Sequence, residues 1–260
     1  MNDQIALNVA LCLYGKAYQN GEKIADFFDN SATQFCKEIK FLETKKTLFG
    51  KVDEKILFEN PNVFFEEMNT FQYDLYYKKN ANRCKERLSV AFAGGCDLWR
   101  LITKKENETF VWKPTWNIGD RDRADSRIWN VSYKKEKNDI LRENNEILLN
   151  NFYNSLKEIY NFSIKEDLLC FAECFKRAMQ TLDSQGNELF GYYKDLVPMC
   201  YKEIEYILDA CQSAWVFGGM GSWNDLYFKD ASVCQEYEMV SENLYNSIIS
   251  AIVQSVNGVV

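Results

Sequence analysis

The chain has 260 residues, a length that suits one large domain or two small ones. Apolar residues make up 47% of it and aromatic residues 15%, so we expect a substantial core and no extended disorder. The net charge of −7 argues against general nucleic-acid binding, which needs an excess of Lys and Arg, and fits a basic partner. The chain contains no histidine, which excludes Ser-His-Asp and Cys-His catalytic groups, histidine metal ligands and histidine general bases.

The sequence pattern predicts neither export nor membrane insertion. The first residues carry no basic region, the apolar run after them is interrupted at Asn8, Gly15 and Lys16, and no run reaches 18 apolar residues. The nine cysteines form no Cys-x-x-Cys pair, so we expect reduced thiols in a soluble, cytoplasmic protein. Cys170 and Cys174 share a predicted helical face. Without histidine or a second close pair, they are expected to be core thiols, with no metal site and no cofactor.

Strand patterns dominate the first 137 residues. Alternating apolar side chains from Ile5 to Leu11 favour a strand, although the alanine content and length of residues 5–18 also permit a helix. Residues 24–33 are expected to form a loop or a short helix, and residues 48–65 are ambiguous around a breaker at Pro61. The clearer strands are joined by short polar turns, which predicts an antiparallel meander with one buried face. These strands span residues 35–42, 71–77, 88–93, 98–103, 109–112 and 128–133.

Near residue 138 the apolar period changes from 2 to 3.6, which predicts helices for the rest of the chain. Ser163 and Glu166 match a capping box, so Ser163 is expected to be the N-cap of the second of these helices. Pro198 is expected to disturb the third. The predicted helices span residues 148–160, 163–182, 192–211 and 232–258.

These patterns together predict an α+β fold. An N-terminal antiparallel β-meander, residues 1–137, is expected to pack against a C-terminal helical bundle, residues 138–260. No flexible linker separates the two parts, so we expect one compact unit.

The stretch 214–228 combines backbone freedom, large apolar side chains and short polar groups. Its glycines permit a sharp turn, and Ser222, Asn224 and Asp225 are suited to capping. One interpretation is a binding loop that offers backbone N–H groups to an anion or presents aromatic anchors to a partner. The other is a tight interhelical turn that docks its aromatic side chains into the protein's own core. The turn glycines are Gly218, Gly219 and Gly221, and the binding candidates are Trp223, Asn224 and Asp225.

The string GGMGSWNDL, residues 218–226, resembles a Gly-Gly-Met-Gly-Ser-aromatic-Asn-Asp-Leu motif of bacterial domains of unknown function. Some of these domains are immunity-type proteins of interbacterial toxin systems. The resemblance covers about a dozen residues and their helix-turn-helix setting, roughly residues 196–256. It implies a bacterial protein that binds a toxin, and it implies no catalytic residue.

A second notable stretch, residues 118–127, alternates acidic and basic side chains. It is interpreted either as a charged recognition loop, as carboxylates gathered on a hard cation, or as a loop neutralised by its own ion pairs. The interleaved arginines would repel a cation, and the glycine and glutamate of a calcium loop are missing, so no metal is expected. The binding candidates are Asp120, Arg121, Asp122 and Arg123.

Two hypotheses of function follow. In the first, the protein acts by binding another protein, as an immunity protein that neutralises a basic toxin, through an acidic patch with aromatic anchors that includes Trp223 and Asp225. In the second, it is a small-molecule-binding protein or a histidine-independent enzyme. Its pocket would then lie between sheet and helices and would be lined by carboxylates such as Asp120, Asp122 or Asp225. The first is favoured because no catalytic constellation is recognisable.

Overall fold

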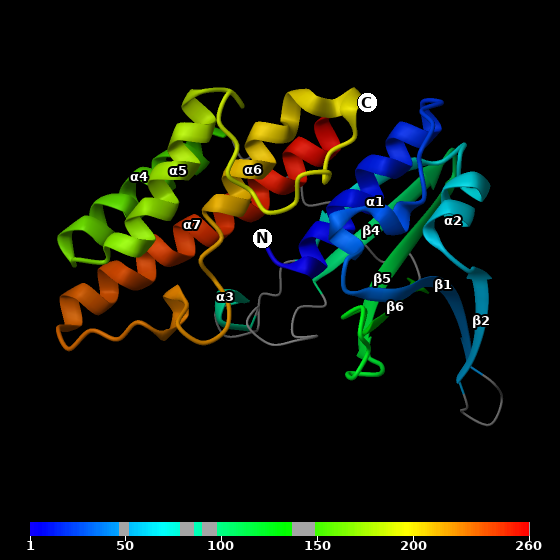
Figure 1. The fold of residues 1–260 in the computed structure, drawn as a ribbon, viewed down its shortest axis with the longest axis horizontal. Coiled ribbons are helices and arrows are strands. Elements are labelled where there is room, and N and C mark those ends of the chain that lie inside the picture. Colours follow the sequence, from blue (N-terminus) through cyan, green and yellow to red (C-terminus); the bar gives the residue numbers. More distant parts are fainter. Residues whose placement is uncertain (47–51, 79–85, 90–97, 137–148, 260) are drawn as a thin grey trace.

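The chain forms a six-stranded sheet that is covered by helices on one face and flanked by a layer of further helices (Figure 1). The computed structural model describes residues 1–46, 52–78, 86–89, 98–136 and 149–259. The strands belong to the N-terminal half and helices α4 to α7 to the C-terminal half. The predicted α+β fold is therefore confirmed.

The sheet has the strand order β2-β1-β6-β5-β4-β3. The consecutive strands β3 to β6 pair antiparallel, as the predicted meander requires, and β4 and β5 form a hairpin. The strands are β1 Cys36–Lys46, β2 Val52–Phe58, β3 Gln72–Tyr77, β4 Trp99–Lys105, β5 Glu108–Ile118 and β6 Trp129–Glu136.

One strand pair departs from the meander. Strand β1 lies beside β6 and runs parallel to it, with Ile39 opposite Val131 and Phe41 opposite Tyr133. Because β1 and β2 form an antiparallel pair of their own, the meander ends at β6, and the first pair of strands extends the sheet from that side. Two parallel strands need a long connection between them, and the alternation of apolar side chains along a strand does not indicate whether its neighbour is parallel.

The helices of the structure are α1 Asp3–Gln19, α2 Pro61–Glu67, α3 Glu86–Ser89, α4 Leu149–Lys165, α5 Leu169–Asp183, α6 Glu205–Ser213 and α7 Ala231–Gly258. Residues 24–33 contain two short 3₁₀ turns, and the ambiguous stretch 48–65 contains β2 and the start of α2, with Asn60 as the N-cap of α2. Leu88 lies in α3, so the strand predicted over residues 88–93 is wrong at its start, and residues 90–93 lie outside the described part. No helix of the described residues is long and apolar enough to cross a membrane.

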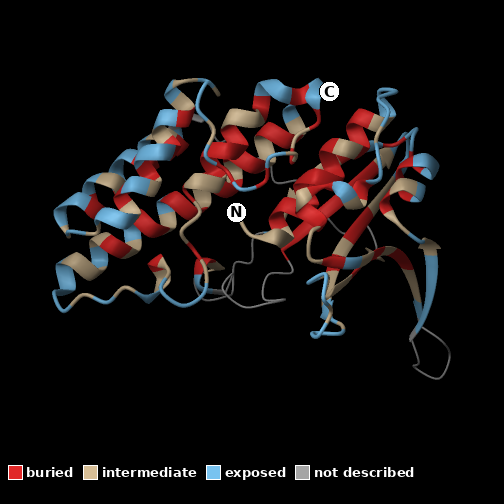
Figure 2. Cartoon of the chain, viewed as in Figure 1, coloured by how far each residue is buried: buried red, intermediate tan, exposed pale blue. Residues whose placement is uncertain are grey.

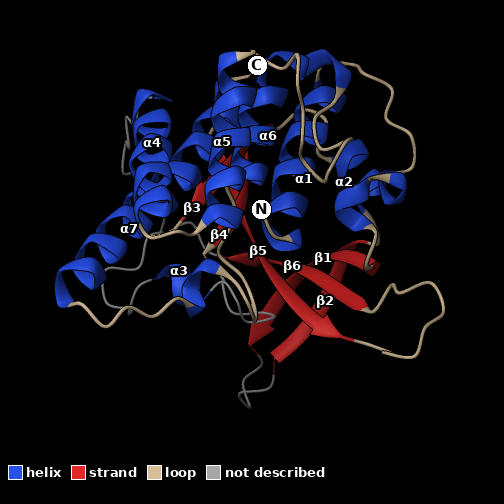
Figure 3. Ribbon diagram, turned by 60° about the vertical axis from the view of Figure 1, so that its left-hand side comes forward, coloured by secondary structure: helices blue, strands red, loops and turns tan. Residues whose placement is uncertain are grey.

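The strand favoured for residues 5–18 is wrong, because this segment is helix α1. Asn2 caps its first turn by accepting a hydrogen bond from the N–H of Ile5. Every residue from Ile5 to Leu13 is buried, so the helix lacks the polar stripe that gives a helical period its signal. Figures 1 and 3 show the reason: α1 lies on the sheet and also faces the helices of the C-terminal half.

Two boundaries in the helical half also differ from the prediction. Ser163 is not an N-cap, because it lies fully buried inside α4 and its hydroxyl donates to the carbonyl oxygen of Ile159. Helix α5 starts at Leu169, after a turn in which Asp167 has a φ of 57°. The third predicted helix is shorter than expected. It consists of a 3₁₀ turn that follows Pro198 and of α6, while residues 192–198 are not helical.

One hydrophobic cluster includes side chains from the sheet, from α1 and from the C-terminal helices. At the sheet, the ring of Phe41 stacks on Phe64 of α2 with ring centroids 3.8 Å apart, and it also contacts Trp112 and Tyr133. Figure 2 shows the buried residues continuing through α1 into α7.

The C-terminal end of α7 is attached to the edge of the sheet. The side-chain amide of Asn257 accepts from the N–H of Leu75 (2.7 Å) and donates to its carbonyl oxygen (2.9 Å). These two bonds satisfy backbone groups of the edge strand β3 that another strand would otherwise pair. The ammonium group of Lys16 in α1 donates to the carbonyl oxygen of Val259 (2.6 Å). A cation at the C-terminal end of a helix stabilises its dipole, so these contacts hold α1, α7 and the sheet together.

We expect a Gly15→Ala substitution to destabilise the protein because α1 packs directly against the sheet residue Tyr73 there. A Cβ at Gly15 would lie 2.4 Å from the buried ring of Tyr73. Overpacking of this kind costs about 1–3 kcal/mol of unfolding free energy. Urea unfolding measures the effect, with Gly258→Ala as the control because a Cβ there meets no atom within 4 Å. Equal stability of the two variants would contradict this packing.

Candidate functional site

The glycine-rich stretch forms a closed loop between α6 and α7. The Asp225 carboxylate accepts from the N–H groups of Gly221 (2.6 Å) and Ser222 (3.2 Å), and the Ser222 hydroxyl donates to the carbonyl oxygen of Gly218 (3.1 Å). Together with the Ser222 side chain, Asp225 completes a capping box around the short 3₁₀ turn Trp223–Asp225. Gly221 has a φ of +77°, so it is the position in this loop where the backbone requires glycine. Asp225 is therefore a cap of the loop.

Trp223 anchors this loop in the core of the helical half. Its side chain is fully buried, and its ring packs edge-on against Phe171 and Phe175 of α5. The indole N–H donates to the hydroxyl of Ser241 (2.7 Å), and the Trp223 carbonyl oxygen accepts from the hydroxyl of Tyr237 (2.6 Å). The side chain of Trp223 thus lies inside the protein, where it attaches the loop to the core of the helical half.

Asn224 binds an arginine that the sequence does not single out. Its side-chain oxygen accepts from Nη1 of Arg87 at 3.0 Å, and its side-chain nitrogen donates to the Arg87 carbonyl oxygen at 2.9 Å. Arg87 belongs to α3 and its side chain is fully buried. The amide therefore fixes both the backbone and the guanidinium group of this residue.

Helix α7 supplies the negative charges around the same guanidinium group. Nη2 of Arg87 donates to a carboxylate oxygen of Glu238, and Nε lies 3.9 Å from a carboxylate oxygen of Glu242. The ring of Tyr237 lies 5.3 Å from the guanidinium carbon, within the range of a cation–π contact. Since a buried charge is tolerated only when it is paired and hydrogen-bonded, these groups explain how Arg87 is accommodated. We call Arg87, Asn224, Tyr237, Glu238 and Glu242 the arginine cluster.

A second polar contact adjoins the arginine cluster. The hydroxyl of Tyr77 in β3 donates to a carboxylate oxygen of Glu86 at 2.5 Å and lies 3.1 Å from the hydroxyl of Tyr245 in α7. Burial, reinforced by Tyr245 and by the hydrogen bond to Glu86, raises the pKa of Tyr77 well above its ordinary value. Tyr77 therefore stays protonated and joins the sheet edge to both α3 and α7.

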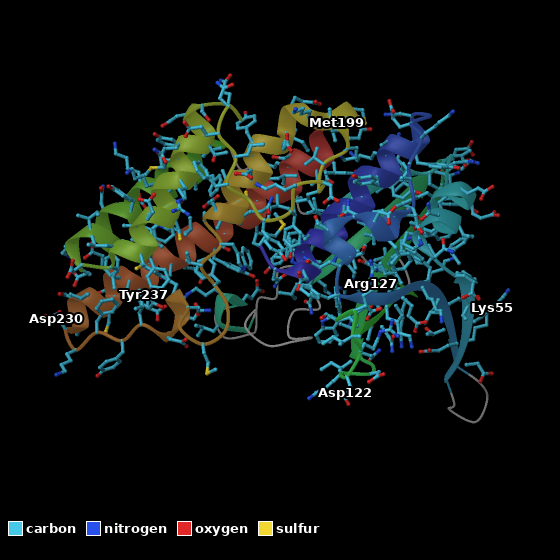
Figure 4. The ribbon with its side chains drawn as sticks, viewed as in Figure 1. Lys55, Asp122, Arg127, Met199, Asp230 and Tyr237 are labelled. Carbon is cyan, nitrogen blue, oxygen red and sulfur yellow. The ribbon has the colours of Figure 1, made fainter. Side chains whose placement is uncertain are left out.

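The alternating loop 118–127 lies elsewhere, at the outer end of the sheet, and Figure 4 shows Asp122 well separated from Tyr237 and Asp230. Arg123 donates to both carboxylate oxygens of Asp125, and this contact lowers the pKa of that exposed carboxyl to about 2. Asp120 accepts from the N–H of Asp122.

The same loop is tied to the body of the protein by Arg127, whose guanidinium group donates to the carbonyl oxygens of Phe28 and Cys36 (both 3.1 Å). The candidates Arg121 and Asp122 are exposed. In the part of the chain that the structure describes, no group of three Cys, Asp or Glu side chains is arranged to hold a metal ion.

Described residues line at least two hollows in the surface. One, of about 420 Å³, lies between the 3₁₀ turns and α2 and contains one carboxylate, that of Asp26. The other, of about 200 Å³, lies where α1, β3 and the end of α7 meet, and its charged groups are Lys16 and Asp74. Asp74 is ion-paired with Lys104, and Lys16 is bound to carbonyl oxygens. The carboxylates Asp120, Asp122 and Asp225 line neither hollow.

The described cysteines are Cys12, Cys36, Cys170, Cys174, Cys200, Cys211 and Cys234, and all are free thiols. The expectation that Cys170 is a core thiol is wrong, because it is exposed and Cys174 is partly buried. Helix α5 buries its other face, which carries Ala172 and Phe175.

We expect Asp225→Ala to lower the stability of the protein, because the Asp225 carboxylate caps the backbone N–H groups of Gly221 and Ser222. The loss of the two capping bonds costs about 1 kcal/mol. Thermal unfolding monitored by circular dichroism tests this, with Met220→Ala as the control because that side chain is fully exposed. An Asp225→Ala variant as stable as Met220→Ala would show that the cap is energetically unimportant.

We expect thiol alkylation of the folded protein to separate the cysteines. Burial raises the pKa of Cys36 to about 12, and it also raises the pKa of Cys211, so neither forms a reactive thiolate near neutral pH. Among the described cysteines, iodoacetamide at pH 7.5 should modify the exposed Cys170 and Cys200 before Cys36 and Cys211, as read by peptide mass spectrometry. Early modification of Cys36 or Cys211 would contradict the described burial.

Comparison of the chain with family models, with curated proteins and with solved structures finds no significant match. The resemblance of residues 218–226 to the bacterial motif therefore stays a prediction. The site is defined by its geometry: a closed loop anchored by Trp223, an amide at Asn224, and carboxylates of α7 around a buried arginine.

Proposed function

We propose that this protein acts by binding another protein through the loop 218–230 and the first turns of α7, residues 231–242, which we call the 218–242 surface. The observation that supports this proposal most directly is a separation of charge along the chain. Residues 149–260 contain 15 acidic and 7 basic side chains, whereas residues 1–148 contain 23 acidic and 24 basic ones. The negative charge of the protein is thus carried by the helical half, and such a field attracts a basic partner and accelerates its association.

The 218–242 surface concentrates this charge. From residue 225 to the C-terminus there are five acidic side chains, and Lys229 is the one basic residue. Asp225 and Asp230 are exposed, and Glu238 and Glu242 remain more than a third exposed although they contact Arg87.

Large apolar side chains lie exposed among these carboxylates. Met220 is fully exposed, Tyr227 is 83% exposed and Met239 is 57% exposed. Because Trp223 and the capping box fix the loop that carries them, the anchors Met220 and Tyr227 are presented on a defined backbone. Aromatic and methionine side chains within a polar rim are typical of protein-binding surfaces.

The partner that fits this surface is a basic protein. Together with the resemblance of residues 218–226 to immunity-type bacterial domains, this makes neutralisation of a basic toxin in the cytoplasm the function that we propose. Neutralisation needs no bond-making chemistry in the protein itself.

The anchors provide a direct test. We expect the triple variant Met220→Ser, Tyr227→Ser, Met239→Ser to fold as stably as the wild type and to lose at least tenfold in affinity for the protein that the wild type captures from its own cells. Removal of exposed anchors weakens binding in this way when they are interface hot spots. Binding should also weaken steeply with salt.

The matched control is Met199→Ser, because Met199 is also a large exposed methionine, at 79%, but lies far from Asp230 (Figure 4). Quantitative pull-down and calorimetry are the readouts. Equal capture by the wild type and the triple variant would contradict the proposal. A captured protein with an acidic surface would also contradict it.

A further inference from the structure

Among the described residues, the groups around the guanidinium of Arg87 come from one continuous part of the chain. Asn224 belongs to the loop, and Tyr237, Glu238 and Glu242 belong to the first turns of α7. The occupant, Arg87, comes from α3, which is more than a hundred residues away in the sequence. Residues 224–242 therefore provide a receptor for a guanidinium group, and α3 provides its ligand.

The receptor is held in shape by contacts that do not involve α3. Trp223 is bound to Ser241 through its indole N–H, and its carbonyl oxygen accepts from Tyr237. Asp225 and Ser222 fix the turn that orients Asn224. The amide, the ring and the helix that carries both carboxylates are thus preorganised.

Arg87 does not use the receptor fully. Its Nε has no hydrogen-bond partner among the described residues, and neither has the Glu242 oxygen that lies 3.9 Å away from it. An arginine can present two parallel N–H groups to a carboxylate, and this geometry binds more strongly than a single contact. The receptor therefore retains an acceptor that Arg87, in its present position, leaves unpaired.

We propose that residues 224–242 form an arginine-binding pocket that Arg87 occupies in cis, and that an arginine side chain of a basic protein partner enters the pocket in its place. This inference rests on the proposed function, since the pocket lies within the 218–242 surface. Lysine is a poorer ligand because a single ammonium group cannot contact the amide and both carboxylates in this arrangement.

Arg87, as the intramolecular occupant, sets the affinity of the pocket for an arginine from another molecule. A tethered ligand competes at an effective concentration on the order of millimolar, so a free arginine side chain binds the wild type weakly. A partner's arginine enters the pocket when the free energy of its other contacts with the 218–242 surface offsets the free-energy cost of releasing Arg87. Removal of Arg87 abolishes that competition and should raise the affinity for a free guanidinium ligand.

The test uses Arg87→Ala and two probes of defined chemistry, guanidinium chloride and N-acetyl-arginine amide. We expect low-millimolar guanidinium to raise the Tm of Arg87→Ala by several degrees in a saturable way, and to leave the wild type unchanged at equal ionic strength. N-acetyl-arginine amide should bind Arg87→Ala at least tenfold more tightly than it binds the wild type, as measured by calorimetry. N-acetyl-lysine amide should show no such gain.

The control variants place the effect in the pocket. In Arg87→Ala combined with Asn224→Ala, or with Glu238→Gln, the guanidinium response should be lost. If Arg87→Ala is unfolded without ligand, recovery of its folded circular dichroism spectrum on addition of guanidinium is the equivalent readout. A response that is absent from Arg87→Ala, or that persists in both double variants, overturns the inference.

The outcome is separable from that of the proposed function. The triple variant of Met220, Tyr227 and Met239 should keep the guanidinium response in an Arg87→Ala background while it loses the protein partner. If guanidinium binds but no partner is captured, the proposed function is refuted, and so is the entry of a partner's arginine. If a partner is captured but Arg87→Ala does not strengthen its binding, only the exchange of Arg87 for the partner's arginine is refuted.

Discussion

One constraint joins α3 to the loop and to the start of α7: the buried charge of the Arg87 guanidinium group must be paired. A charge removed from water must be paired and hydrogen-bonded, and the loss of one partner leaves a costly uncompensated group. This requirement explains why Asn224 and Glu238 lie beside Arg87. It also explains the composition of the 218–226 string: Asp225 and Ser222 close the turn, Trp223 attaches it to the core, and Asn224 is then aimed at the arginine.

Helix α7 connects this charge to the sheet. Its N-terminal turns carry the carboxylates that face Arg87, and its C-terminal end binds β3 through Asn257 and receives Lys16 from α1. Between these ends the helix contributes Tyr245 to the contact with Tyr77. A single 28-residue helix thus fixes the distance between the edge of the sheet and the loop. Such a scaffold presents Tyr227 and Met239 at defined positions, which lowers the entropy cost of binding.

The sequence predicts elements well where one face is buried and the other is wet. Strands β3 and β6 have that alternation, and their positions follow from it. Helix α1 does not, because the sheet and the C-terminal helices bury it on both sides and leave no polar stripe. Ser163 fails for a related reason: the Ser-x-x-Glu string is a local signal, but packing keeps that residue inside α4, where its hydroxyl finds a carbonyl oxygen one turn earlier. Tertiary burial overrides both local patterns.

The candidate site likewise contains one role that the local sequence predicts and one contact that it does not. The role of Asp225 is local, since it caps a turn within four residues, and the sequence contains that information. The pairing of Arg87 with Glu238 joins residues 151 positions apart, and it buries an arginine, which composition alone argues against. Charge offers a partial signal. The net charge of −7 is carried by the helical half, which has 15 acidic and 7 basic residues. Arg87, the one fully buried arginine among the described residues, comes from the other half and places its positive charge against that half. A surface that already holds a guanidinium group within its own chain has the chemistry to hold one from another protein.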